Sequence, residues 1–101
     1  MPFQYKIHKE ALKEYADSYV WYENEQKGLG ERLIDSIDKK IEQICDHPQY
    51  YSLVYGSYRQ TTIESFPFTI VYQIFPERNL VHISSIFHNS RNPRKKFRKD
   101  Q

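Results

Sequence analysis

Residues whose side chains could carry out acid–base chemistry gather around His88, near the end of the chain. Arg91 follows His88 by three residues, and Arg59 comes from an earlier segment. Cleavage of an RNA phosphodiester needs such groups: a base for the 2′-hydroxyl proton, cations for the phosphate and an acid for the leaving oxygen. His88, Arg91 and Arg59 are therefore a candidate catalytic set. The structural alternatives are a surface histidine that ends a strand and an arginine paired with an acid such as Glu64.

A basic segment follows His88. Residues 89–101 contain six Lys or Arg and one acid, Asp100, whereas the net charge of the whole chain is only +2. The basic charge is therefore local, which is typical of a protein with a polyanionic partner. The alternative, of about equal weight, is a solvated tail that keeps the protein soluble. The candidate nucleic-acid-binding residues are Arg94, Lys95, Lys96, Arg98 and Lys99.

Neither a metal site nor a cofactor is expected. The four histidines are dispersed, and the sequence has no Cys-x-x-Cys motif. His82 and His88 would share one face of a strand, but six residues of strand separate them by roughly 20 Å. Gly28 and Gly30 lie between two helical segments and do not open a βαβ unit, so they do not predict a nucleotide site.

Length and composition limit the remaining possibilities. A chain of 101 residues leaves room for one domain, expected at residues 1–101 with the basic tail at 89–101. The mean hydropathy is −0.83, and no apolar run approaches the ~20 residues of a membrane span. Charged residues near the start break any secretory signal. The single cysteine, Cys45, cannot form an internal disulfide, so we expect a cytoplasmic protein.

Two helices are expected, at residues 9–26 and 31–46. Apolar residues recur there at spacings of three and four, which predicts one buried stripe on each helix. Pro48 ends the second helix, and the short connection between the two predicts an antiparallel hairpin. The first stripe comprises Leu12, Tyr15, Ala16, Tyr19 and Val20, with Trp21 and Tyr22 beside it. The second comprises Leu33, Ile34, Ile37, Ile41, Ile44 and Cys45.

Four strands complete the expected fold. Residues 3–7 alternate between apolar and polar side chains, and further strands are expected at 58–63, 68–75 and 80–87. Short turns make the last three an antiparallel meander. Residues 49–57 are expected to form a polar, tyrosine-rich connection. The predicted class is α+β with the order β-α-α-β-β-β: a helical hairpin packed on one face of a mainly antiparallel four-stranded sheet.

Several short motifs occur in a fixed order along nearly the whole chain. The first half contains Trp21-Tyr22-Glu23, Gly28-Leu29-Gly30, Ile37-Asp38, Ile44 and Pro48. The second half contains Tyr58-Arg59, Phe66-Pro67-Phe68, Ile70-Val71-Tyr72, Ile83, Ile86-Phe87-His88 and Arg91-Asn92-Pro93. In their order and spacing these motifs resemble the RelE/ParE superfamily of toxins from type II toxin–antitoxin modules.

The resemblance implies the same fold and a cytoplasmic bacterial or archaeal toxin held inactive by a cognate antitoxin. RelE-like members cut mRNA in the ribosomal A site, whereas ParE-like members inhibit DNA gyrase and need no nuclease centre. The chain departs from the RelE-like pattern, because Thr69 and Asn89 stand where those members commonly carry arginines. No tyrosine follows Phe87. Arg59 falls close to a basic position of RelE-like members.

Three functions therefore remain open. The first is a ribosome-dependent endoribonuclease that uses His88, Arg91, Arg59 and the tail cations. The second is a non-enzymatic inhibitor of DNA gyrase, and the third is an interaction module that only binds its antitoxin. The expected partners are the antitoxin and either the ribosome with its mRNA or gyrase, with no membrane partner.

Overall fold

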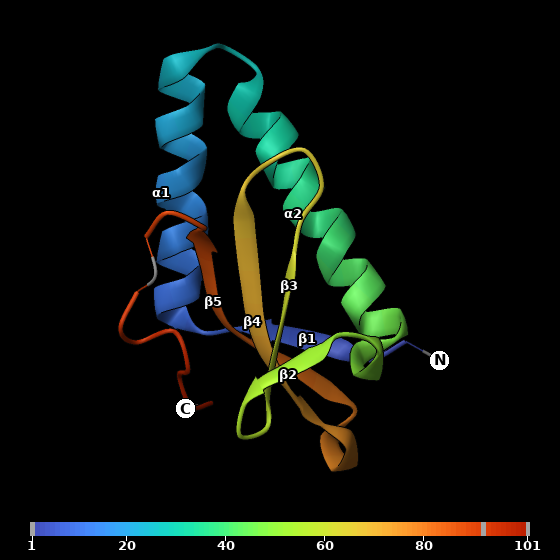
Figure 1. Ribbon diagram of the computed structural model, residues 1–101. Helices are drawn as coiled ribbons and strands as arrows, with labels where there is room; N and C mark the ends of the chain where they lie inside the picture. Colours follow the sequence, from blue (N-terminus) through green and yellow to red (C-terminus); the bar gives the residue numbers. More distant parts are fainter. Residues whose placement is uncertain (1, 92, 101) are drawn as a thin grey trace.

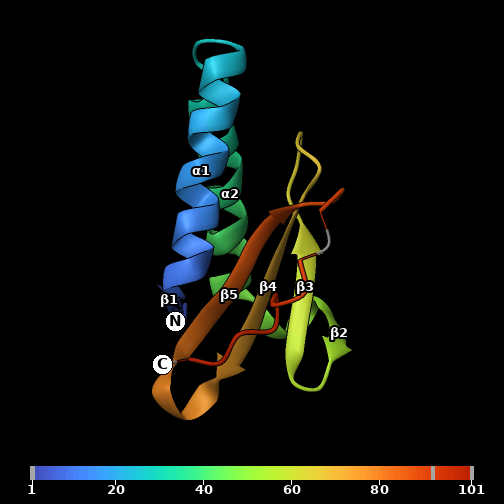
Figure 2. The same cartoon turned by 90° about the vertical axis from the view of Figure 1, so that its left-hand side faces the viewer.

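The computed structural model describes residues 2–91 and 93–100, in which two helices cover one face of a sheet. The helices lie side by side as an antiparallel hairpin (Figure 1), and both are on the same side of the strands (Figure 2). Within this part of the chain, neither helix is long and apolar enough to span a membrane. The elements are β1 (Gln4–Ile7), α1 (Lys9–Glu25), α2 (Leu29–Asp46), the 3-10 turn η1 (Pro48–Tyr50), β2 (Ser52–Tyr55), β3 (Tyr58–Thr62), β4 (Phe68–Phe75), the 3-10 turn η2 (Pro76–Arg78) and β5 (Leu80–His88).

The sheet confirms the predicted α+β class but has five strands where four were expected. Its order is β1-β5-β4-β3-β2; β1 runs parallel to β5, and the other neighbours are antiparallel. The additional strand, β2, lies in the segment predicted to be a connection. Gly56 has a φ of +53°, which a tight hairpin turn requires, and Tyr55 pairs with Tyr58 across that turn. Once this turn brings β3 alongside as a pairing partner, a strand is favoured by the residue types of Leu53, Val54 and Tyr55.

The Gly28-Leu29-Gly30 motif shapes the apex of the hairpin. Gly28 has a backbone φ of +88°, a value that residues other than glycine rarely adopt. A Cβ on Gly30 would lie 2.7 Å from the carbonyl oxygen of Tyr19, so only glycine lets the helices approach this closely. The carboxylate of Glu23 accepts hydrogen bonds from the backbone N–H groups of Gly28 and Gly30, at 2.9 and 3.0 Å. These contacts satisfy donors at the start of α2.

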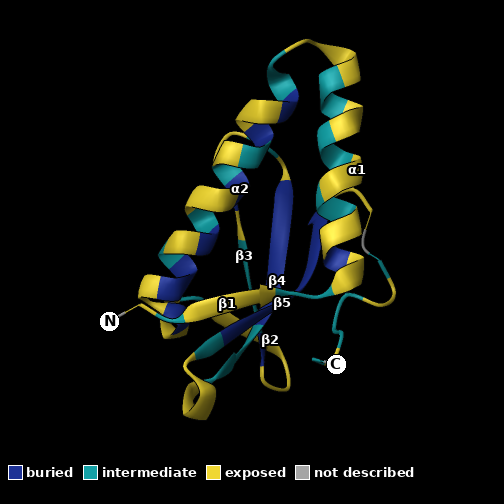
Figure 3. Cartoon of the chain, turned by 180° about the vertical axis from the view of Figure 1, so that it is seen from behind, coloured by how far each residue is buried: buried dark blue, intermediate teal, exposed yellow. Residues whose placement is uncertain are grey.

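The apolar stripe of α2 confirms the prediction, and the stripe of α1 does not. Five of the six predicted residues are buried in one cluster with Ile70, Tyr72 and Ile83 of the sheet: Leu33, Ile37, Ile41, Ile44 and Cys45. Ile34, the sixth, is only partly buried. On α1 the residue that is completely buried is Ala11, whereas Leu12, Val20 and Trp21 are about half exposed. Figure 3 shows exposed residues along much of α1. Burial raises the pKa of the Cys45 thiol to about 11, so this thiol stays protonated and unreactive.

A β-bulge in β5 decides which face each of its side chains occupies. Tyr72 pairs with Ile83 and the preceding Val71 pairs with Ser85, so Ser84 is an extra residue on β5. The alternation of side chains therefore reverses between Ile83 and Ser85. His88 pairs with Phe68 and joins the helix side, while His82 pairs with Gln73 on the opposite side. The expectation that His82 and His88 share a face was wrong for this reason.

Candidate functional site

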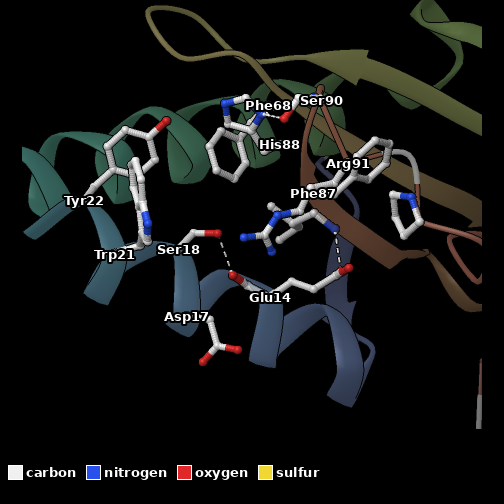
Figure 4. Close-up of a pocket in the computed structure, with 12 residues that line it drawn as sticks. Glu14, Asp17, Ser18, Trp21, Tyr22, Phe68, Phe87, His88, Ser90 and Arg91 are labelled. Carbon is white, nitrogen blue, oxygen red and sulfur yellow. Dashed lines mark hydrogen bonds between the residues drawn. The ribbon is translucent and has the colours of Figure 1, made fainter. Parts of the chain in front are cut away.

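A pocket of about 640 Å³ lies between α1 and the end of β5. Its walls are an apolar and aromatic surface with charged groups at both sides, as Figure 4 shows. Helix α1 contributes Glu14, Asp17, Ser18, Trp21 and Tyr22; the strands contribute Phe68, Ile86, Phe87 and His88; and the loop that follows β5 contributes Ser90, Arg91 and Pro93.

Two of the three predicted catalytic residues line this pocket. The His88 ring lies edge-on to Phe68, with the ring centroids 5.4 Å apart. Its Nδ1 lies 3.1 Å from the backbone N–H of Ser90 and 2.8 Å from the Ser90 hydroxyl. The backbone N–H of Arg91 donates to the carbonyl of His88 at 2.9 Å, which places Arg91 beside it. Because Nδ1 accepts from Ser90, Nε2 is the ring nitrogen left for a ligand.

The third predicted residue, Arg59, lies elsewhere on the sheet. Its guanidinium donates to the carbonyl oxygens of Tyr51 and Gln49, at 2.6 and 3.3 Å. Arg59 pairs with Tyr72, four residues along β4 from the Phe68–His88 pair, a distance of about 13 Å at strand rise. The side chain therefore ties η1 and the start of β2 to β3. The predicted partner Glu64 is not its neighbour; Glu64 lies 4.0 Å from Lys39.

Glu14 is a site residue that sequence reasoning missed. Its carboxylate accepts hydrogen bonds from the Ser85 hydroxyl, the Ile86 backbone N–H and the Arg98 guanidinium, each at 3.0 Å. Strand β1 pairs with β5 only as far as Ile83, so the edge of β5 beyond that residue has no neighbouring strand among the residues that the structure describes. Glu14 therefore accepts hydrogen bonds that a neighbouring strand would otherwise accept along part of this edge. No local pattern marks it, because its partners are more than 70 residues away in the sequence.

The basic tail folds back along the strands rather than extending into solvent (Figure 2). Phe97 stacks on Tyr55 and lies tilted against Tyr58, with ring centroids 4.9 and 5.1 Å away, on the sheet face opposite the helices. Lys96 lies over the rings of Phe87 and Phe97, and Arg98 forms an ion pair with Glu14. The candidate nucleic-acid-binding residues are thus divided. Lys96 and Arg98 make contacts within the protein, whereas Arg94, Lys95 and Lys99 are exposed.

The two positions that depart from the RelE-like pattern lie next to each other. The hydroxyl of Thr69 donates to the side-chain oxygen of Asn89 at 2.5 Å, on the face where the tail packs. The fold therefore brings these positions together, and the pair that results is neutral.

Comparison with known proteins identifies the family. A family model described as the ParE toxin of the type II toxin–antitoxin system parDE matches residues 5–93. A search of curated proteins found no match.

Solved structures resemble the fold at low sequence identity. A chain of the chromosomal ParDE system of Pseudomonas aeruginosa has a TM-score of 0.73 and 13% identity over 85% of this chain and 95% of that one. The isolated Escherichia coli RelE toxin has a TM-score of 0.67 and 19% identity over 89% and 87%. A chain of the RelBE2 toxin–antitoxin complex of Mycobacterium tuberculosis has a TM-score of 0.65 and 12% identity over 87% and 99%. The pocket and the tail are therefore features of a chain that belongs to the ParE toxin family of type II toxin–antitoxin systems.

Proposed function

We propose that this toxin inhibits growth by binding its target, and that the target is DNA gyrase. The observation that carries the proposal is the neutral Thr69–Asn89 pair. RelE-like nucleases commonly have arginines at these positions, and a phosphodiester in its transition state needs cations to hold the developing charge. A hydroxyl bonded to an amide cannot supply that charge.

The other cations support the same proposal. Arg59 donates to two backbone carbonyls, and Arg98 is paired with Glu14, so both are already engaged within the protein. In the pocket, His88 and Arg91 face Asp17 and Glu14 of α1. The carboxylate of Asp17 would repel a phosphate in this pocket, whereas Arg98 already neutralises Glu14. A pocket of mixed charge with aromatic walls suits a protein surface.

One observation favours the competing function, ribosome-dependent cleavage of mRNA. His88 and Arg91 lie together in one pocket, and a base and a cation are two of the three kinds of group that such cleavage requires. Inhibition of gyrase would change the supercoiling of DNA in the cell, whereas cleavage would produce new mRNA ends, so the two functions can be distinguished directly.

A cognate antitoxin is the second proposed partner. The E. coli and Pyrococcus horikoshii structures of similar fold include complexes of RelE with RelB. Arg94, Lys95 and Lys99 are exposed on the tail and would attract an acidic segment of such an antitoxin.

The test is to express the toxin in bacteria without an antitoxin and to examine DNA and mRNA from the same culture. We expect plasmid DNA to lose negative supercoils while the 5′ ends of mRNA remain unchanged. New mRNA ends at codon positions, with plasmid supercoiling unaltered, would contradict the proposal. An empty vector and a growth-arresting ribosome inhibitor control for arrest itself.

A further inference from the structure

The tail ends at a cluster of basic side chains that holds the Asp100 carboxylate. Lys6 Nζ lies 3.0 Å from one carboxylate oxygen, and Arg78 Nη1 lies 2.9 Å from the other. Nε2 of His82 lies 3.8 Å from the first oxygen. The Asp100 side chain is only 10% exposed, and its hydrogen bond to Lys6 is the main cause that lowers the pKa of its carboxyl group.

This cluster is built by the folded body rather than by the tail. Lys6 and His82 are register partners in the β1–β5 pair, and the Arg78 guanidinium stacks over the Phe75 ring at 5.2 Å. His82 is completely buried, and neither of its ring nitrogens has a hydrogen-bond partner among the described residues. Its charged and titratable neighbours are Lys6, His8, Arg78 and Asp100. A carboxylate is therefore the ligand that this arrangement fits.

Side-chain contacts hold the rest of the tail. The Ser84 hydroxyl donates to the carbonyl of Lys96 at 2.7 Å, and the Phe97 ring packs against two tyrosine rings. Arg98 donates to Glu14 at 3.0 Å and to the carbonyl of Ser84 at 2.9 Å. Residues 93–100 include no helix or strand, as far as they are described. A segment of this kind can detach locally without unfolding the sheet beneath it.

We propose that Lys6, Arg78 and His82 form a carboxylate-binding site that, with Asp100 as its ligand, acts as a reversible latch for the tail. The latch sets the charge of the pocket through Arg98. While the latch is closed, Arg98 neutralises Glu14 at the pocket wall. When it opens, Arg98 leaves, and Glu14 and Asp17 both present uncompensated negative charge on the same side of α1. This inference concerns the pocket used in the proposed function, but its tests do not involve gyrase.

The first test measures opening of the tail by limited trypsin digestion of the full chain. Asp100→Ala should speed cleavage after Arg94 and Lys95 by about tenfold, the factor that corresponds to about 1.4 kcal/mol. Cleavage after Lys99 is not scored, because Asp100 is adjacent to that bond. Asp46→Ala, at an exposed position at the end of α2, makes the same change of charge and should cleave like the wild type. Equal cleavage of all three proteins would overturn the latch.

The second test measures the charge of the pocket through Trp21, the only tryptophan of the chain, which lines it. Its fluorescence is quenched with caesium, a cation, and with iodide, an anion. Opening the latch should raise the ratio of caesium to iodide quenching in Asp100→Ala by about twofold, as Arg98→Gln should also do. Removing one negative charge from the protein would by itself lower the ratio of caesium to iodide quenching, and Asp46→Ala measures that effect alone. If the quenching ratio of Asp100→Ala equals that of Asp46→Ala, opening of the latch does not change the charge of the pocket, and the proposal is overturned.

Discussion

Glu14 shows how one side chain can replace a missing strand. Strand β1 stops pairing with β5 at Ile83, and the carboxylate of Glu14 then accepts from Ser85 and Ile86 of the uncovered edge. An exposed strand edge is prone to pairing with other chains, and an inward-pointing charge protects it. Arg98 compensates that charge, with the two side chains only 23% and 15% exposed.

Replacing Glu14 by Gln tests this role. The change leaves Arg98 without its ion pair in a partly buried position, so we expect a loss of about 1–3 kcal/mol in the free energy of unfolding. Urea denaturation measures it. Asp17→Asn, an exposed acid one turn further along α1, is the matched control and should change stability by less than about 0.5 kcal/mol. A Glu14→Gln protein as stable as the control would show that the carboxylate is dispensable.

The candidate site was predicted only where its residues are neighbours in the sequence. His88 and Arg91 are three residues apart, and the structure brings both into the pocket. Arg59 was grouped with them because it lies on a neighbouring strand of the predicted meander. Side-chain direction and register place it with the carbonyls of Gln49 and Tyr51. Glu14 was missed because it reads as an ordinary polar residue of a helix.

His88→Gln separates a catalytic role from a binding role. A glutamine keeps approximate size and hydrogen bonding but cannot take up a proton, so loss of a general base would lower a cleavage rate by roughly 10²–10⁴. We predict that the variant still arrests growth in cells that lack the antitoxin. Colony counts after induction measure this, with protein levels matched by immunoblot. Survival of cells that express well-folded His88→Gln would return His88 to the list of catalytic residues.

At the level of the elements, the helices differ in how far their sequence predicts their burial. The stripe of helix α2 is buried in one cluster with Ile70 and Tyr72 of β4, the central strand of the sheet. Helix α1 contacts α2 and β5, and its apolar residues exceed the surface available to cover them, so Leu12, Val20 and Trp21 remain half exposed. The periodicity of apolar residues predicts which side chains share one face of a helix, but it does not predict which elements pack against that face.

Ile37→Ala tests the packing of α2 on the sheet. Ile37 is completely buried in the main cluster, so the truncation should lower the free energy of unfolding by about 2–5 kcal/mol. Val20→Ala on the exposed side of α1 is the matched control, for which a change within about 0.5 kcal/mol is expected. A small cost for Ile37→Ala in urea denaturation would mean that the two layers pack differently.

His82 makes the stability of β5 depend on pH. Burial lowers the pKa of His82 below its ordinary value of about 6.5, so between the two pKa values the unfolded chain binds more protons than the folded one. The free energy of unfolding therefore rises with pH. The contribution of neutral, buried His82 to that free energy is complete above about pH 6.5 and is lost as the pH falls through the folded-state pKa of His82.

Urea midpoints measured from about pH 7.5 to pH 5 test this linkage. His82→Gln should flatten the decline on acidification, whereas His47→Gln, which changes an exposed histidine, should keep it. If His82→Gln retains the wild-type pH dependence, the decline arises from other groups.

At the scale of the whole molecule, the α+β architecture could be predicted because short connections leave few topologies open. The parallel pairing of β1 with β5 and the fifth strand could not, since both depend on pairings that no local pattern encodes. The course of the tail was unpredictable for the same reason. Its basic residues predicted a solvated or anion-binding segment, but Phe97, Arg98 and Asp100 fix it to three separate places on the fold.

Supercoiling of relaxed plasmid DNA by purified gyrase, titrated with the purified toxin, tests the proposed binding mechanism most directly. A binding inhibitor acts in proportion to the complex formed, so we predict that activity falls with increasing toxin and is abolished near molar equivalence when both proteins are well above their Kd. The His88→Gln protein should give the same curve. Undiminished supercoiling at a large molar excess of toxin, together with cleavage of mRNA by the same preparation in a translating extract, would contradict the proposed function.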